Sequence, residues 1–210
     1  MKNNTGVNFC ILSIAVFALA LNGCMSIADS PVPRQYMPHS LAAQETNEFD
    51  YPSKGIIGIG PVRIPEYLNR PQMVIREKNN LYTFSQFDRW AEPLDTVILR
   101  LLDDGVSTML VNADTVKFSW SILVPVKYQV TVDVIQMESE LDGDLRLSAR
   151  WNIFDLESKS LIFTKRSEIV TPITPHDYFG MSNALSSTVQ ALSAEVAGEL
   201  SGIAKKAAVR

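Results

Sequence analysis

The second half of the chain alternates apolar and polar residues with the period of two that half-buried β-strands have. One alternating run covers residues 126–134 and a second covers 145–153. Asp142-Gly143 lies between the two runs, and an Asp-Gly pair is typical of a hairpin turn. A third strand with a more mixed pattern is predicted at 161–171, after a turn at 155–160. The pattern therefore predicts a three-stranded meander that needs a cover on one face.

A helix is predicted before this meander, from about Glu92 to Asn112. Pro93 falls in its first turn, where a missing N–H is tolerated. The apolar residues recur at helical spacing and mark one face: Leu94, Val97, Ile98, Leu101, Leu102, Met109 and Leu110. Gly105 lies inside the segment, where we expect it to end or kink the helix.

A longer helix is predicted after the meander. It is expected to begin at Thr174-Pro175, with Thr174 as the N-cap and Asp177 in the first turn. Its apolar stripe consists of Tyr178, Met181, Leu185, Leu192, Val196, Leu200 and Ile203. We expect this stripe to pack on the sheet, and the alternative is an exposed coiled segment that binds a partner.

Shorter segments rich in proline and glycine precede the first helix. Residues 58–65 are predicted to form a strand at a sheet edge, because proline cannot donate to a ladder of hydrogen bonds. A turn-rich loop at 66–71, a strand at 72–76 and a segment at 87–94 that leads into the helix follow. The predicted fold is α+β: a two-layer domain at 35–208, with a mixed β-sheet and two long helices packed on it.

Residues 1–23 have the pattern of a lipoprotein signal peptide, with a basic Lys2 and a nearly unbroken apolar run at 7–21. Leu21-Asn22-Gly23-Cys24 then has the form of a lipobox. We expect the Cys24 thiol to take a diacylglyceryl group and its new amine to take an acyl chain such as palmitate, which together anchor the protein durably in a membrane. The alternatives are an uncleaved membrane helix, for which the run is short, and an ordinary signal peptide with a chance cysteine.

Residues 24–34 are predicted to be the lipidated N-terminus and a flexible tether, because they show little periodicity. Residues 35–53 are predicted to contain a short strand and a loop. Cys10 would leave with the signal peptide, and Cys24 would be acylated. No thiol would then remain for a disulfide or a cysteine metal site.

Charge and motifs argue against several classes of function. The net charge of −4, which becomes −5 when Lys2 is removed, is opposite to the basic surface that binds nucleic acid. Neither of the two histidines has a nearby metal-ligand companion, and the sequence has no G-x-S-x-G or P-loop motif. Gly58 and Gly60 do not complete a dinucleotide motif, because position 63 is Arg; we expect them to let the strand approach another backbone. We therefore predict no enzyme activity, no catalytic residue, no metal site and no cofactor other than the lipid on Cys24.

Two long motifs resemble the ABC-type transport auxiliary lipoproteins, the PqiC-like family of the paraquat-inducible operon lipoprotein. They are G-P-V-x-I-P-x-Y-L-N-R-P-Q-M-V-x-R at 60–76 and F-x-R-W-A-E-P-L at 87–94. The resemblance implies a non-catalytic lipoprotein that works beside an MCE-type membrane-spanning protein in lipid transport between membranes and supports envelope integrity. Met25 follows Cys24 where Asp would retain a lipoprotein in the inner membrane, so resemblance to bacterial lipoprotein sorting favours the outer membrane, facing the periplasm. We also expect a homo-oligomer, and the alternative function is a lipid-binding module that holds a lipid between sheet and helix.

The loop at 66–71 is the predicted partner-binding site. Loops positioned by a rigid scaffold often carry recognition. Tyr67 and Arg70 are residue types that anchor interfaces, and Leu68 would fill a small apolar pocket on a partner. The alternative is that all three residues are structural.

Phe87, Arg89 and Trp90 of the second motif are also types that anchor interfaces, but we favour a structural role for them. Phe87 and Trp90 lead directly toward the first helix, so we expect them to pack beneath it. Arg89 is expected to pair with Glu92 or another neighbour.

Overall fold

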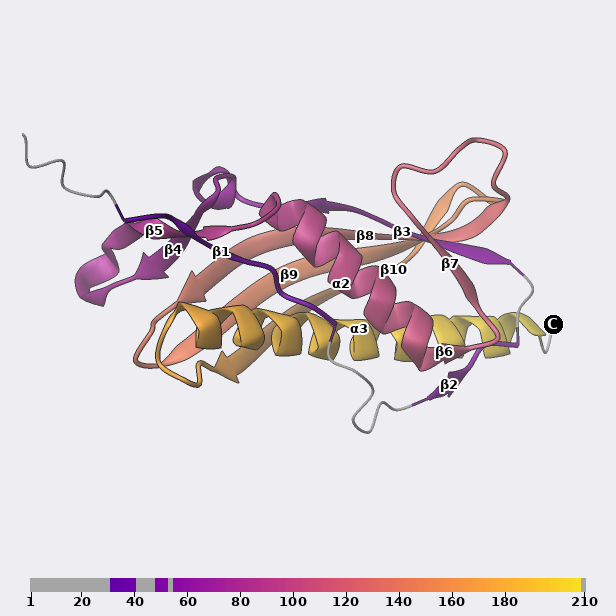
Figure 1. The fold of residues 1–210 in the computed structure, drawn as a ribbon. Coiled ribbons are helices and arrows are strands. Elements are labelled where there is room, and N and C mark those ends of the chain that lie inside the picture. Colours follow the sequence, from indigo (N-terminus) through magenta and orange to yellow (C-terminus); the bar gives the residue numbers. More distant parts are fainter. Residues whose placement is uncertain (1–30, 41–47, 53–54, 209–210) are drawn as a thin grey trace, which may run out of the picture. The chain divides into compact units, whose positions relative to one another are not determined.

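The computed structural model describes residues 31–40, 48–52 and 55–208. The signal peptide and Cys24 lie outside the described residues, so the predictions about them stay predictions. The observed fold is α+β, as predicted, with a mixed sheet and two helices that cover one of its faces (Figure 1).

The large sheet has five strands in the order β10-β9-β8-β3-β7. Their bounds are β3 (Ile56–Arg63), β7 (Asp114–Lys117), β8 (Val126–Ser139), β9 (Asp144–Asp155) and β10 (Ser160–Pro172). β8, β9 and β10 form the antiparallel meander that the alternating pattern predicts. β3 runs parallel to both β8 and β7, and this parallel pairing makes the sheet mixed.

The predicted hairpin joins β8 to β9. The Gly143 amide donates to the Glu140 carbonyl at 2.8 Å, which closes the turn at Asp142-Gly143. Along β9, Leu147 and Trp151 face the core, while Arg146 and Arg150 are exposed to solvent. The alternation therefore separates a core face from a solvated face, as expected for an antiparallel sheet.

Two helices cover the core face of the large sheet (Figure 1). α2 spans Leu94–Met109 and α3 spans Tyr178–Ala208. α2 is shorter than predicted at both ends, because Pro93 stands just before its first residue and the chain leaves the helix at Leu110. There it forms β6 (Leu110–Val111), which pairs in parallel with β2 (Phe49–Asp50).

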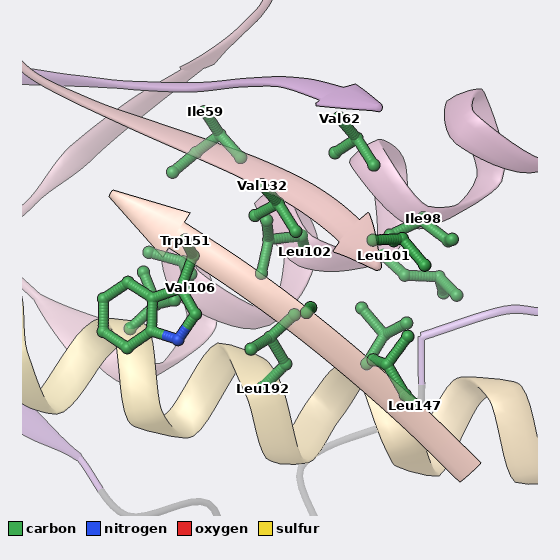
Figure 2. Close-up of a cluster of buried hydrophobic side chains, with 14 of the residues drawn as sticks. Ile59, Val62, Ile98, Leu101, Leu102, Val106, Val132, Leu147, Trp151 and Leu192 are labelled. Carbon is green, nitrogen blue, oxygen red and sulfur yellow. The ribbon is translucent and has the colours of Figure 1, made fainter. Parts of the chain in front are cut away.

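The core lies between the helices and the sheet. Figure 2 shows side chains of β3, β8 and β9 together with Leu102 of α2 and Leu192 of α3. Gly105 neither ends nor kinks α2, contrary to expectation. It instead lets α3 come close, because a Cβ at this position would lie 2.5 Å from the Ser193 Oγ. The apolar stripe of α3 is buried in this core, which confirms core packing over an exposed helix.

α3 begins later than predicted, and its cap is a different residue. The Asp177 carboxylate accepts from the Gly180 amide at 2.7 Å, and the Asp177 carbonyl accepts from the Met181 amide at 2.9 Å. Asp177 is therefore the N-cap, and the prediction of Thr174 is wrong. Both residues are of capping type, and the fold selects the one that directly precedes the helix.

The strand predicted at 58–65 is β3, two residues earlier in the sequence. β7 pairs only with Ile56–Ile59, so the rest of β3 is an edge on that side. On the other side, the pairing with β8 shifts register between Ile59 and Val62. Pro61 thus lies where the ladder is already interrupted, which is the position that a residue without an N–H tolerates.

The remaining strands form the small sheet, in the order β1-β5-β4. Its elements are β1 (Arg34–Tyr36), β4 (Gln72–Arg76) and β5 (Tyr82–Trp90), with two short 3-10 helices, η1 (Glu66–Leu68) and η2 (Lys78–Asn80). β4 has the predicted bounds. β5 was not predicted; it pairs with the neighbouring β4 and with β1, but its burial pattern does not alternate regularly.

Candidate functional site

A buried carboxylate fixes the first strand to the rest of the domain. Asp88 is 3% exposed, and its Oδ1 accepts from the Tyr36 hydroxyl at 3.0 Å and pairs with the Arg34 guanidinium at 2.8 Å. Its Oδ2 accepts from the Ser85 hydroxyl at 2.8 Å. We name Arg34, Tyr36, Ser85 and Asp88 the Asp88 clamp. The clamp holds the segment that directly follows the predicted tether.

The surroundings of the clamp reinforce it. Burial, followed by the hydrogen bond to Asp88, raises the pKa of Tyr36, so its hydroxyl stays protonated and keeps donating. The Ala91 amide donates to the Tyr36 carbonyl at 2.9 Å. Arg100 of α2 then donates to the Pro38 carbonyl at 2.8 Å. The segment from β1 to Pro38 is therefore bound by both the small sheet and α2.

Sequence reasoning missed this clamp, although a signal was present. Asp is depleted in strands, so Asp88 between aromatic residues in F-D-R-W indicates a carboxylate with a specific partner. The partners could not be identified from the sequence, because Arg34 and Tyr36 are more than fifty residues away.

The structure gives Tyr67 a structural bond. Its hydroxyl donates to the Met137 carbonyl and accepts from the Met137 amide, both at 3.1 Å. Its ring centroid lies 5.3 Å from that of Tyr82. Tyr67 thereby connects η1 to the far end of β8, where it satisfies both backbone groups of one residue.

A second buried carboxylate joins the small sheet to the large one. Glu138 of β8 accepts from the Tyr82 hydroxyl at 2.7 Å and from the side-chain amide of Gln136 at 2.6 Å, and it pairs with Arg76 at 3.0 Å. The hydrogen bond to Glu138, together with burial, raises the pKa of Tyr82 to about 12. This network holds β4 and β5 against β8.

The predicted partner-binding residues have different positions. Leu68 is 2% exposed and belongs to the core, so it is not available to contact a partner in this structure. Tyr67 is half-buried. Arg70 is partly exposed, and its guanidinium carbon lies 4.1 Å from the centre of the exposed Phe84 ring. Of the three, Arg70 is the residue best placed to reach a partner, and the binding role itself stays a prediction.

The second motif is partly structural, as predicted. Trp90 is buried at 4% exposure, but Phe87 is 38% exposed and does not pack beneath α2. Phe87 lies two residues after Ser85, where the register of β5 against β4 is irregular and the Asp88 amide donates to the Ser85 hydroxyl. Glu92 pairs with Arg100 at 3.7 Å, so the expected pair of Arg89 with Glu92 is not observed.

The described residues include neither a metal-binding cluster nor a helix that could span a membrane. No cluster of three or more His, Cys, Asp or Glu side chains in this part of the chain could hold a metal ion. None of the described helices is both long enough and apolar enough to cross a membrane.

The fold and the site define a class: an α+β scaffold domain that is held by its first strand and presents arginine and aromatic side chains on a small sheet. The profile of one family, described as the ABC-type transport auxiliary lipoprotein component, matches residues 39–197. The chain belongs to this family of lipoproteins, which act as auxiliary components of a transport system and therefore have partners.

Solved structures share the fold. An uncharacterised protein has 17% identity and a TM-score of 0.66, and the similarity covers 81% of this chain and 99% of that one. A Xanthomonas campestris protein has 10% identity and a TM-score of 0.65, with 84% and 100% covered. No curated protein matches the sequence significantly.

Proposed function

We propose that this lipoprotein is anchored in the outer membrane by acyl chains on Cys24, faces the periplasm and is a non-catalytic component of an MCE-type intermembrane lipid transport system. In this role it binds the membrane-spanning transport protein through the small sheet, as a homo-oligomer. The observation that carries the proposal is the Asp88 clamp. It joins Arg34 and Tyr36, which directly follow the predicted tether, to the small sheet, which contains part of both family motifs.

The surface of the small sheet supports a binding role. Arg70 and Phe84 form an exposed cation–π pair, and arginine and aromatic residues are the types that most often dominate interface energies. The Nε atom of Arg70 is buried without a hydrogen-bond partner. The rest of the Arg70 side chain is partly exposed, and an acceptor on a partner protein that reached the exposed part of the guanidinium would form a charge-assisted hydrogen bond.

The alternative, a lipid held between sheet and helix, has less support. The pocket at the α2–α3 surface beside Leu101, Gly105 and Ser186 has a volume of about 10 Å³. Ligand pockets usually hold several hundred Å³. The side chains between the helices and the sheet fill that layer, with Leu102, Val130 and others fully buried.

Partner binding is tested by Arg70→Ala in the acylated protein. The variant should fold normally and lose about tenfold or more in affinity for the co-purified transport protein, which corresponds to about 1.4 kcal/mol. Arg63→Ala is the matched control, since Arg63 belongs to the same motif but is exposed and pairs with Asp133 on the large sheet. Equal affinity of the two variants and the parent would refute binding through Arg70.

Anchoring and sorting are tested at the N-terminus. Cys24→Ala should abolish acylation, as measured by the mass of the mature N-terminal peptide. Met25→Asp should move the protein toward the inner-membrane fraction of a density gradient without changing its melting temperature. An unmodified Cys24 in the parent, or identical distribution of the parent and the Met25 variant, would count against the outer-membrane assignment.

A further inference from the structure

An apolar loop connects β7 to β8 and projects from the end of the large sheet (Figure 1). The apolar loop is residues 118–125, FSWSILVP, and it contains no charged side chain. Ile122 is 97% exposed and Leu123 is 87% exposed, more than any other large hydrophobic side chain in the described part of the chain. A pair of fully exposed branched aliphatic residues at a loop tip indicates a contact outside the domain.

The backbone of the tip does not require these residues. The Val124 amide donates to the Ser121 carbonyl at 3.0 Å, so Ile122 and Leu123 occupy the centre of a tight turn. Turn centres usually hold Gly, Pro, Asn, Asp or Ser, which have conformational reasons to be there. Neither the turn nor the core therefore accounts for Ile122 and Leu123.

The base of the loop is fixed on β3. The Phe118 amide donates to the Ile59 carbonyl at 2.8 Å, and the Phe118 and Trp120 rings meet edge to face at 5.6 Å. Trp120 lies over Gly58, where a Cβ would come within 2.5 Å of the indole. The glycine that we expected to allow a backbone contact thus allows an aromatic one, and the tip is presented by a packed base.

The charged residues nearest to the loop in sequence are basic, although acidic side chains also lie close, with Asp103 beside Lys117 and with Asp155 and Glu157 near Tyr128. Lys117 and Lys127 are the first charged residues on either side of it. The Lys117 ammonium lies 3.8 Å from Asp103 of α2, and the Lys127 ammonium lies 5.3 Å from the ring centre of Tyr128. Lysines that flank an apolar, tryptophan-containing segment are suited to a bilayer surface, because their stems remain in apolar surroundings while the ammonium reaches the phosphates.

We propose that the apolar loop inserts Ile122 and Leu123 into the surface of the phospholipid bilayer that holds the acyl anchor. This inference rests on the anchoring of Cys24 in the proposed function. Arg34 lies ten positions after Cys24, so the extended connection reaches at most about 35 Å. The small sheet is therefore held near the same bilayer.

The insertion also predicts how the domain lies on the membrane. The loop precedes the first residue of β8, whereas Glu138 at the other end of β8 contacts the small sheet. The 14 residues of β8 span about 45 Å, more than the tether can reach. A domain standing upright on its loop would exceed the reach of the tether, so β8 must be inclined away from the membrane normal, with one attachment near each end.

Tryptophan fluorescence tests the insertion in the acylated full-length mature protein. Trp90 and Trp151 are buried, and Trp120 is the more exposed third tryptophan, at the base of the loop. In vesicles of phosphatidylethanolamine and phosphatidylglycerol, brominated acyl chains should quench the emission of the parent. Trp120→Phe should remove the quenched component.

The double variant Ile122→Ser/Leu123→Ser should lose the quenching while its melting temperature stays unchanged, because exposed side chains contribute little to stability. The control is Leu81→Ser/Val170→Ser, which removes two side chains of 58% and 53% exposure and should keep the quenching. If the parent protein is acylated but its emission is not quenched, the loop inference is overturned. This holds even if the double variant loses a protein partner. If mass analysis instead finds no acyl chains on Cys24, the proposed anchoring is overturned.

Discussion

Asp88→Ala should release β1 from the domain. The three partners of the carboxylate determine how much free energy this substitution removes. The Arg34 side chain is 65% exposed, so solvent screens its ion pair, which contributes little to stability. The hydroxyls of Tyr36 and Ser85 donate to a buried charged acceptor, and such bonds contribute about 1.5–3 kcal/mol each.

Because the freed hydroxyls can regain water once β1 moves, we expect a net loss of about 3 kcal/mol in the free energy that holds β1. This corresponds to roughly 100-fold faster amide exchange in a peptide that covers residues 34–38. The global melting temperature should fall by less than the roughly 6–12 °C that a loss of this size in the whole domain would give, because β1 opens locally.

Hydrogen exchange followed by mass spectrometry measures this effect peptide by peptide. Asp133→Ala is the control, since Asp133 forms an exposed ion pair with Arg63 at 3.2 Å and should change exchange little anywhere. Unchanged exchange at 34–38 in the Asp88 variant would refute the reasoning. It would mean that backbone pairing with β5 and the bond from Arg100 hold the segment without the carboxylate.

Two further predictions concern stability. The pKa of Tyr82 is raised to about 12 from an ordinary 10, so between these values the folded state keeps a proton that the unfolded state loses. The stability that this provides is therefore full below pH 10 and falls as the pH rises toward 12. Tyr82→Phe should reduce that fall in pH-dependent denaturation. If the parent and the variant lose stability equally over this pH range, the hydrogen bond from Tyr82 to Glu138 is not the cause of the loss. Gly105→Ala should destabilise by about 1–3 kcal/mol in urea unfolding, because its methyl group would collide with Ser193, although alanine is the better helix former. Gly202→Ala in α3 is the control: its Cβ would meet no atom within 4 Å, so it should stabilise the protein. A Gly105 variant as stable as the parent would show that the two helices can move apart.

The parts of the fold that depend on local pattern could be predicted. The alternation at 126–134 and 145–153, the Asp-Gly turn and the two apolar helix faces each lie within one segment, and the structure contains all of them. The pairing of β1 with β5 and of β3 with β7 could not be predicted in the same way. These are parallel pairings between segments that are distant in sequence, and no local pattern encodes a distant partner.

The candidate site shows the same limit at the level of single residues. Tyr67, Leu68 and Arg70 are neighbours in sequence, but one bonds to β8, one is in the core and one reaches the surface. Residue type predicts that a tyrosine or leucine will lose contact with water, but not whether the covering group belongs to the same chain or to a partner.

The family motif stabilises two distant parts of the domain through different residues. Gly60, the first residue of the motif, lies against the base of the apolar loop, where a Cβ would come within 2.8 Å of the Phe118 Cβ, and Tyr67 is bonded to the opposite end of β8. β8 is continuous between these points, so the orientation of the small sheet and that of the apolar loop are set by one strand. A rigid strand cannot orient two surfaces independently. If the small sheet binds a partner and the apolar loop contacts the bilayer, the length of β8 fixes how far from the loop that partner must lie.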